Sequence, residues 1–432
     1  GISIRSLFFS LAKHISEKLK KINKPPLIVW GGIQPTLNPE KCLPWADIIV
    51  IGEGEKAFVE ICKDKKFKGI KNIYYHLKNR VIRNDTGYVE ENLDSIPFPD
   101  FSDKNKYLIN ENKLVPLSEK YKTRYYLMTS KGCPFNCSYC CNSTLSKMCR
   151  GKYLRRRSVD NVISELKEAK KNCPNLLSIS FVDDVFTFDK EWLKDFSPKY
   201  KKEINIPFFC FTHAKMCDEE IIKYLKFAGL SSVAMGVQSF SYRIKKIYSR
   251  FEKNEQIIKV LKLLKKYKIE FTLDIIMDNP LEEEEDLKIN LNCLLKIPSP
   301  FHLSTHTLTY FPNTALTDSF IEKGIIKKED VEDEIEKGWG RWTPSLDLSR
   351  NKLNLFYDCL YFLTKLRFRS EFLIRKIQEN KYFRENPKRL AKFLRFFSVD
   401  ISSLDWDSRA DKFKFLIFQG LTSLVKRDFK FL

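Results

Sequence analysis

The chain has 432 residues, of which 43% are hydrophobic and 13% aromatic, and its formal charge is +21. This composition is that of a folded protein with a large core and excludes a disordered chain, and no apolar run approaches the roughly 18 residues that a membrane-spanning helix needs. Twelve irregularly spaced cysteines and the lack of an evident secretory signal favour a reducing compartment, the cytoplasm, over a disulfide framework.

The positive charge also raises the question of a nucleic-acid partner, because a basic surface attracts phosphates. Much of the excess is Lys at helical positions, as in 262–266, where it covers a solvated face. The better candidate is the basic and aromatic stretch 361–397, for which we still favour a helix that packs its aromatic side on the protein. Its cations are Arg367, Arg369, Arg375, Arg384, Lys388, Arg389 and Arg395. Nucleic acid is therefore the less favoured partner.

The first predicted segment, residues 1–75, has an α/β pattern in which glycines follow two apolar runs. The runs are Leu27–Trp30 and Ala46–Ile51, and the glycines are Gly31, Gly32, Gly52 and Gly54. Glycine at a strand terminus lets the backbone approach a bulky nucleotide tail, because no Cβ stands in the way. A plain strand-to-helix turn is the alternative interpretation.

This segment looks like the last strands of a cobalamin-binding Rossmann-like domain. The chain begins at Gly1 rather than Met and enters such a domain at about its third strand, so we interpret the lobe as truncated. His14 falls within a helical pattern, and we expect it to be an exposed helix residue rather than a cobalt ligand. Whether this chain binds cobalamin stays open. Residues 76–120 are predicted to form a linker, with a turn at 84–87.

Three cysteines, Cys133, Cys137 and Cys140, have the spacing C-x3-C-x2-C. Three thiolates on one short loop can ligate an iron–sulfur cluster and leave one iron open for a substrate or cofactor. A structural zinc site normally needs a second C-x2-C pair at a distance, and the sequence contains none. A fourth ligand would close the open iron, so we interpret Cys141 as a bystander.

The cysteine loop resembles the signature of the radical S-adenosylmethionine (SAM) superfamily, including Tyr139 directly before the last cysteine. The resemblance implies a [4Fe-4S] cluster held by Cys133, Cys137 and Cys140, with SAM bound at the open iron and the Tyr139 ring against its adenine. It also implies a 5′-deoxyadenosyl radical that abstracts hydrogen from a substrate carbon, and an electron donor such as flavodoxin or ferredoxin.

After this loop a short β-rich run followed by a helical pattern recurs six times, which is typical of a parallel β/α array. Strands are predicted at Tyr125–Thr129, Leu177–Val182, Pro207–Thr212, Ser232–Val237, Phe271–Met277 and His302–Leu308. Helices are predicted at Val159–Lys171, Lys190–Lys202, Asp218–Phe227, Asn254–Lys268, Glu282–Leu295 and Thr314–Glu322. The resemblance implies that residues 121–325 form a partial (β/α)6 TIM-like barrel, with its site at the carboxyl ends of the strands.

Polar residues follow several of these strands. Asp183 and Asp184 stand where the superfamily often has Gly-Gly-Glu, which receives the SAM amino group, and an Asp can accept from an ammonium as Glu does. By resemblance to radical SAM proteins with a cobalamin domain, Gln238 and Ser239 lie near the ribose and methionyl parts of SAM, and Arg250 meets its carboxylate. The alternative is that Ser239 only caps the next helix.

Residues 326–432 are predicted to form a helical C-terminal region, with an ordered loop at 338–344 whose Trp339 and Trp342 line the substrate opening or serve as packing anchors. The leading hypothesis is an α/β radical SAM enzyme that depends on cobalamin, with methyl transfer to an unknown small-molecule, peptide or lipid-type substrate. The alternatives are a radical SAM enzyme without cobalamin and, from another class, a basic nucleic-acid-binding or RNA-modifying protein.

Overall fold

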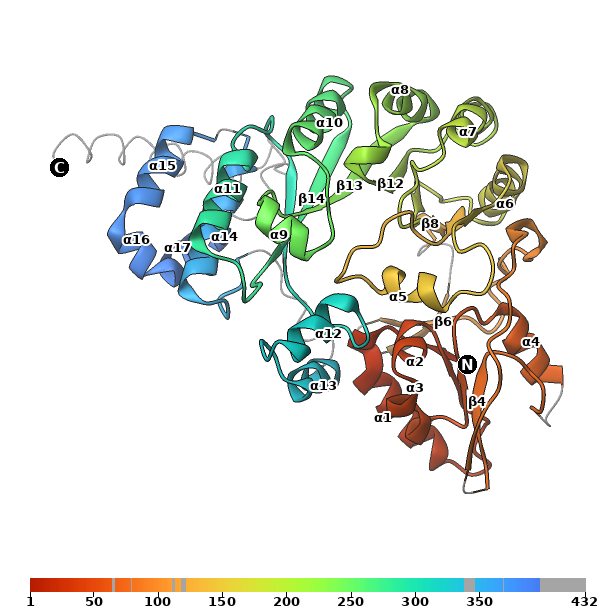
Figure 1. Ribbon diagram of the computed structural model, residues 1–432. Coiled ribbons are helices and arrows are strands. Elements are labelled where there is room, and N and C mark those ends of the chain that lie inside the picture. Colours follow the sequence, from red (N-terminus) through yellow and green to blue (C-terminus); the bar gives the residue numbers. More distant parts are fainter. Residues whose placement is uncertain are drawn as a thin grey trace. The chain divides into compact units, whose positions relative to one another are not determined.

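The computed structural model of the protein describes residues 1–63, 67–78, 80–110, 113–117, 122–337, 346–367 and 369–396. The chain divides into two compact units (Figure 1). The first comprises Gly1–Val233, Lys246–Phe251 and Thr309–Trp342, and the second comprises Ala234–Lys245, Glu252–Leu308 and Thr343–Leu432. The predicted loop at 338–344, with Trp339 and Trp342, and the C-terminal residues from 397 onward lie outside the described residues.

The first unit begins with an α/β lobe whose five-stranded sheet has the order β1-β2-β3-β4-β5. Its strands are β1 (Ile2–Ser3), β2 (Val29–Gly31), β3 (Ile48–Val50), β4 (Ile73–Leu77) and β5 (Arg80–Arg83). Strands β1, β2 and β3 are parallel, whereas β4 and β5 form an antiparallel hairpin on the β3 edge. The predicted lobe end at residue 75 therefore falls inside β4, because a hairpin extends the sheet to Arg83. The lobe helices are α1 (Phe9–Lys20), α2 (Ile33–Leu37), α3 (Pro39–Cys42) and α4 (Glu55–Lys63).

The core of this lobe is built around Trp30. Its ring meets that of Phe9 edge-on at 5.9 Å between centroids, and its indole N–H donates to Ser16 Oγ at 2.9 Å. Val331 and Ile335 of α13 (Lys328–Lys337) belong to the same cluster of buried side chains. Residues predicted as the start of the C-terminal region thus complete the core of the first lobe, a long-range packing choice that no local pattern encodes.

A second sheet contains six strands in the order β15-β14-β13-β12-β11-β8. They are β8 (Arg124–Leu127), β11 (Ser178–Phe181), β12 (Phe208–Thr212), β13 (Leu230–Gln238), β14 (Glu270–Met277) and β15 (His302–Thr307). In the first unit β8, β11 and β12 are parallel, and in the second unit so are β14 and β15. All six predicted strands are confirmed, and so is the parallel α/β fold class.

The predicted helices are also confirmed. Several of them begin or end at a residue that caps the helix. Ser158, Asp189 and Asp218 each accept a backbone N–H at a helix start, and Gly229 ends α8 with a φ of 114°. The helices are α6 (Val159–Asn172), α7 (Lys190–Glu203), α8 (Glu219–Ala228), α10 (Asn254–Lys266), α11 (Glu284–Leu294) and α12 (Ala315–Glu322). In the first unit α6, α7 and α8 lie side by side (Figure 1).

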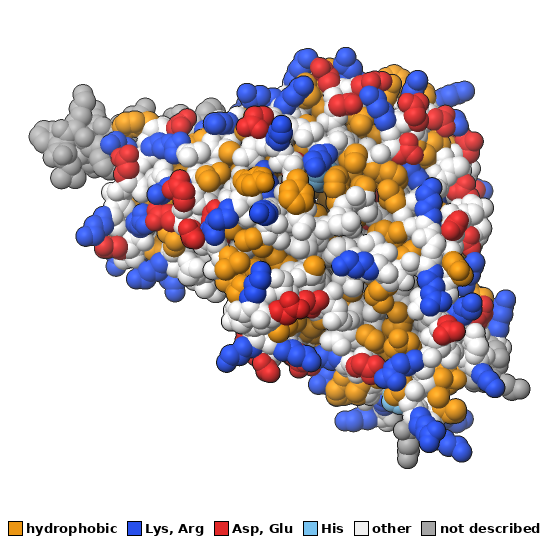
Figure 2. Space-filling view, in the orientation of Figure 1, with side chains coloured by type: hydrophobic (Ala, Val, Ile, Leu, Met, Phe, Trp, Pro, Cys, Tyr) orange, Lys and Arg blue, Asp and Glu red, His pale blue; other side chains and the backbone are white. Residues whose placement is uncertain are grey.

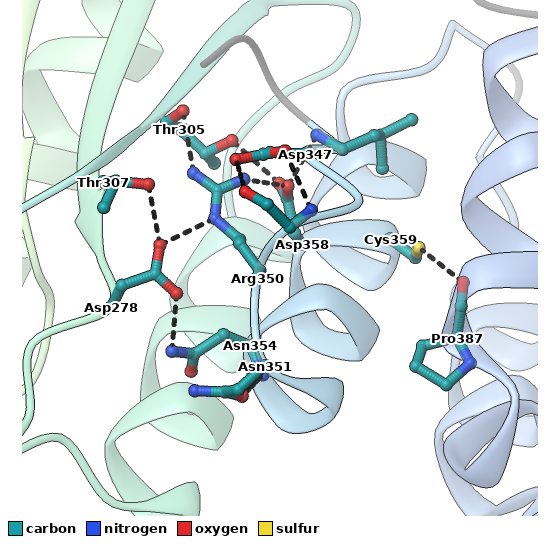
Figure 3. A network of polar contacts seen from close by, with 12 residues as sticks. Asp278, Thr305, Thr307, Asp347, Arg350, Asn351, Asn354, Asp358, Cys359 and Pro387 are labelled. Carbon is teal, nitrogen blue, oxygen red and sulfur yellow. Dashed lines mark hydrogen bonds and ion pairs between the residues drawn. The ribbon is translucent and has the colours of Figure 1, made fainter. Parts of the chain in front are cut away.

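In the second unit a buried polar network joins β14, β15 and α14 (Lys352–Thr364) (Figure 3). Arg350 Nε lies 2.9 Å from Asp278 Oδ2, and its Nη1 lies 2.5 Å from Asp358 Oδ2. Thr305 donates to Asp358 at 2.8 Å, and Asn354 donates to Asp278 at the same distance. Because the two carboxylates and the guanidinium satisfy one another, the network specifies how α14 packs on the two strands.

Shorter elements complete the described residues. The predicted linker contains the hairpin β6 (Tyr107–Asn110) and β7 (Lys113–Pro116), and α14 is followed by α15 (Glu371–Glu379), α16 (Lys381–Glu385) and α17 (Pro387–Phe396). The helical C-terminal region is thus confirmed for its described part, and no described helix is long and apolar enough to cross a membrane. Figure 2 shows basic and acidic side chains interspersed over the face in view.

Candidate functional site

The cysteine loop starts from a backbone position that only glycine adopts without strain. Strands β9 (Ser130–Lys131) and β10 (Arg155–Arg156) pair antiparallel at its base. Between them Gly132 has a φ of +89°, and a Cβ on it would lie 2.6 Å from the carbonyl oxygen of Tyr153. Glycine is therefore required here both by the left-handed backbone and by the close approach of Tyr153, which lies just before β10.

The three predicted cluster cysteines lie within one turn of chain that leads into α5 (Cys141–Met148). Cys137 is buried, whereas Cys133 and Cys140 are half-buried. Burial raises the pKa of Cys133 to about 12, and a hydrogen bond from the Cys141 thiol lowers the pKa of Cys140 to about 7. The sequence placed Cys141 outside the ligand set, and here its thiol contacts the last of the three cysteines.

No group of three His, Cys, Asp or Glu side chains in the described part of the chain converges on a point that would hold a single metal ion. An iron–sulfur cluster has a different requirement. Each thiolate binds its own iron at a separate corner of the cluster, so the three sulfur atoms need not converge. The lack of a convergent group among the described residues therefore does not test the cluster expected at this loop.

Residues 246–251 pack against the cysteine loop within the first unit. The backbone N–H of Ser138 donates to Tyr248 O at 3.1 Å, and its hydroxyl donates to Ile247 O at 2.7 Å. The Tyr139 ring meets the Tyr248 ring edge-on at 5.2 Å. Arg250, which is 7% exposed, reaches the Tyr139 hydroxyl at 3.2 Å and Cys137 Sγ at 3.8 Å. A predicted SAM contact thus lies directly beside the predicted cluster ligands.

The two predicted aspartates have different surroundings. Asp183 is fully buried, and its Oδ1 accepts from the backbone N–H of Thr129 at 3.0 Å and from the hydroxyls of Thr129 and Ser130. Asp184 is exposed, and its charge is close enough to the loop to raise the pKa of Cys133. A hydrogen bond also joins Asp184 to Asn142, the second residue of α5. Of the pair, only Asp184 is available to a ligand beside the cysteines.

One contact at the loop was not predicted. The ring of Phe135, between the first two cysteines, stacks on His213 with 3.8 Å between ring centroids. His213 follows β12, and its Nδ1 accepts the backbone N–H of Lys215. The sequence signal was the polar Thr-His pair at the end of a predicted parallel strand, where such folds gather their functional residues. The partner Phe135 could not be inferred from one sequence.

In the second unit, Gln238 ends β13 with a φ of +67°, a backbone conformation that few residues other than glycine adopt. Ser239 is fully buried, and its hydroxyl donates to Asn290 Oδ1 at 3.2 Å and accepts from the N–H of Ser241. Ser239 thus supports its own turn and does not cap the next helix as the alternative expected, because the hydroxyl that accepts a helix-start N–H, that of Ile244, belongs to Ser241.

The four glycines of the first lobe lie at the carboxyl ends of β2 and β3. Gly32 has a φ of +96°, and an added Cβ would meet the Ile4 backbone at 2.8 Å, whereas a Cβ on Gly52 would meet nothing within 4 Å. The hydroxyl of Thr36 donates to Gly32 O and accepts the Gly52 N–H, which ties the two turns together. Gly31 and Gly54 both lie against Val50. Of the four, only Gly52 has open space at its Cβ position, whereas Gly31, Gly32 and Gly54 make room for neighbouring parts of the lobe itself.

Ion pairs hold this glycine edge against the base of the cysteine loop. Glu53 lies between Gly52 and Gly54 and pairs with Arg155 of β10, whose side chain is 2% exposed. Lys131, two residues before Cys133, pairs with Glu53 at 3.5 Å and also with Glu55. Both sets of residues belong to the first unit, so the two predicted cofactor edges adjoin within one compact body.

A second connection runs through the loop after β15. The side-chain amide of Asn313 donates to the carbonyl of Leu37 in α2, and the carbonyl of Asn313 accepts the hydroxyl of Thr144 in α5. Helix α2 begins directly after Gly32, and α5 begins directly after Cys140. The elements that follow the glycine turn and the cysteine loop are therefore held by one residue.

Comparison with known proteins bears on this site. The sequence model of the Radical SAM superfamily matches residues 127–292. An uncharacterized methyltransferase from Pyrococcus horikoshii is 28% identical over 338 residues, which cover 76% of this chain and 70% of that protein. Bacteriochlorophyllide d C-8(2)-methyltransferase from Chlorobaculum tepidum is 25% identical over 341 residues, covering 77% of this chain and 70% of that one.

Among solved structures, the cobalamin-dependent S-adenosylmethionine radical enzyme OxsB, with aqua-cobalamin and SAM bound, is similar with a TM-score of 0.63. The similarity extends over 98% of this chain and 66% of that one, at 16% sequence identity. At this identity the comparison supports the fold, namely a barrel of the radical SAM type together with the lobe that precedes it.

Proposed function

We propose that this chain is a radical SAM enzyme whose [4Fe-4S] cluster is held by Cys133, Cys137 and Cys140, and the match of the Radical SAM superfamily model to residues 127–292 supports this proposal. The observation that carries this proposal is the three-cysteine loop itself, fixed by Gly132 at its start and packed against Arg250 and Tyr248. When bound, the reduced cluster supplies the electron that cleaves SAM to methionine and a 5′-deoxyadenosyl radical.

The chain's own residues would bind and orient SAM. Asp184 offers a carboxylate beside the loop for the ammonium group, through a charge-assisted hydrogen bond. Arg250 offers a buried cation for the carboxylate, and Tyr139 offers a ring for the adenine. Gln238 remains our proposed contact for the ribose or methionyl part. Asp183 would position the start of the loop through Thr129 and Ser130 and would not touch the ligand.

We further propose that the enzyme binds cobalamin and transfers a methyl group. Gly52, which follows β3, has no protein atom within 4 Å of its Cβ position, and the Glu53–Arg155 ion pair keeps this turn next to the cysteine loop. The bacteriochlorophyllide and archaeal relatives are named methyltransferases, which favours this reaction. His14 is exposed on α1 and His76 hydrogen-bonds with the carbonyl of Leu43, so neither is placed as a cobalt ligand. A cytoplasmic location and a flavodoxin or ferredoxin donor complete the proposal.

The first test is cluster content. After anaerobic reconstitution the protein should contain about four irons and four sulfides per chain and should form 5′-deoxyadenosine from SAM under reduction. Replacing Cys133, Cys137 and Cys140 together by Ala should abolish both. Cys141→Ala and Cys149→Ala are matched controls that remove a neighbouring thiol and should retain both. Cleavage of SAM by the triple variant would refute the assignment.

A separate test addresses cobalamin. Equilibrium binding to the reconstituted protein should reach about one cobalamin per chain, and Gly52→Ala should weaken it several-fold by placing a methyl group at the open glycine position. A Cβ on Gly52 would meet no protein atom within 4 Å, and its φ of +72° costs about 1 kcal/mol, so this variant should fold and keep its iron. Absence of stoichiometric binding by the parent protein would leave radical SAM chemistry without cobalamin as the better function.

A further inference from the structure

The exposed face of α17 is basic and carries no acid. Leu390, Ala391 and Leu394 are buried where the helix packs on α14. The outward side presents four exposed cations, Lys388, Arg389, Lys392 and Arg395, and the helix sequence contains no Asp or Glu. With one face anchored in the protein, the helix presents its cations on the other as a fixed array.

Three of these cations, Lys388, Arg389 and Lys392, are not neutralised by described residues as the cations of the neighbouring helices are. On α15 and α16 each Lys or Arg forms an ion pair with a carboxylate, for example Arg375 with Glu371 and Arg384 with Glu284. By contrast, no carboxylate within the described residues forms an ion pair with Lys388, Arg389 or Lys392. A cluster of like charges without counter-charges raises the energy of the free protein and is relieved by an anionic partner.

Aromatic rings lie among these cations. Phe393 is 43% exposed, next to Lys392 and one turn from Arg389. Tyr382, on α16, is 51% exposed and accepts a hydrogen bond from Arg389 Nη1 at 2.6 Å. Exposed rings beside cations are the composition of protein surfaces that lie at a bilayer interface, where cations meet headgroups and rings reach the apolar layer below.

We propose that the exposed face of α17 binds the surface of an anionic lipid bilayer. A flat array of lipid phosphates matches the outward side of a straight helix, whereas single-stranded nucleic acid is typically bound in a basic groove that follows its backbone. An exposed phenylalanine on this face gains an apolar environment beneath the headgroups. This inference is independent of the proposed radical SAM activity, because α17 contributes no residue to the cysteine loop.

Vesicle sedimentation with the reconstituted full chain tests the proposal. Vesicles of equal parts phosphatidylglycerol and phosphatidylcholine should bind the protein at 0.1 M salt, and vesicles of phosphatidylcholine alone should not. Replacing Lys388, Arg389 and Lys392 together by Gln should weaken binding roughly 100-fold, since each cation near such a surface contributes about a fivefold gain. Phe393→Ala, which alters no charge, should weaken it several-fold.

The matched control lies on α10, where Lys259, Lys262 and Lys266 are also exposed. Changing these three to Gln removes the same charge from a helix without exposed rings and should weaken vesicle binding less than threefold. Equal losses in the two triple variants, or no binding to the anionic vesicles, would overturn the proposal. Binding of a 30-nucleotide RNA that depends on the α17 cations and exceeds vesicle binding would overturn it in favour of nucleic acid.

Discussion

At the scale of single residues, Gly132 is the position on which the cysteine loop depends most. Gly132→Ala would force a Cβ to within 2.6 Å of Tyr153 O at a φ of +89°. Gly69, with a φ of +85° and no atom within 4 Å of its Cβ position, shares the backbone strain but not the clash. We expect Gly69→Ala to cost about 1 kcal/mol and Gly132→Ala several times more, with loss of cluster iron.

Iron content and urea denaturation of the two glycine variants measure this difference. Equal destabilisation by both substitutions would mean that the close contact with Tyr153 is relieved by a small backbone shift, and that the left-handed φ alone is what requires glycine at position 132.

Substitutions of the two aspartates after β11, Asp183 and Asp184, should likewise have different effects. Asp184→Asn removes the carboxylate beside the cysteine loop and should raise the SAM dissociation constant at least tenfold with little change in stability, because a charge-assisted hydrogen bond is lost. Asp183→Asn weakens a buried acceptor of three donors and should lower the free energy of unfolding by about 1–3 kcal/mol. Equilibrium dialysis with SAM and urea denaturation distinguish them, and reversed effects would exchange the roles.

At the scale of elements, the turn between β14 and α11 holds a carboxyl group that favours its proton. Burial raises the pKa of Glu282 from 4.5 to about 8; the nearby Asp286 and Asp278 add to this shift, and Arg243 opposes it. Neither carboxyl oxygen of Glu282 has a hydrogen-bond partner among the described residues. Since the folded state holds the proton more tightly than the unfolded state, stability should fall as pH rises from about 4.5 to 8.

Glu282→Gln removes the titrating group, so the decrease in the free energy of unfolding between pH 4.5 and 8 should become smaller by an amount on the order of a few kcal/mol. At pH 8 the variant should therefore be more stable than the parent protein. Urea midpoints between pH 5 and 8 measure the effect. The exposed Glu285→Gln serves as control and should follow the parent protein. Parallel curves for the parent and Glu282→Gln would contradict the prediction.

At the scale of the whole molecule, the first lobe depends on a helix about 300 residues further along the chain. Ile335 of α13 is 3% exposed within the core around Trp30. Ile335→Ala should therefore destabilise this lobe by about 2–5 kcal/mol and loosen cobalamin binding, if the lobe binds it. Denaturation followed by Trp fluorescence measures the loss, and Glu332→Ala, exposed on the same helix, should change it little.

The sequence alone determined the repeating part of this protein. Strands such as β12 and β14 and helices such as α6 and α8 were predicted within one residue at each end, because hydrophobic periodicity and capping side chains are local signals. The cysteine spacing predicted the cluster loop for the same reason, since three ligands on one turn need no distant partner.

Only the tertiary structure decided which side chains meet. It placed Asp184 rather than Asp183 beside the cysteines, buried Ser239 under its own turn, brought Arg250 to Cys137 and added α13 to the first lobe. It also revealed the Glu53–Arg155 pair that holds the glycine edge at the cysteine loop. These outcomes depend on contacts between residues far apart in the chain, and one sequence carries no periodicity or spacing that records them.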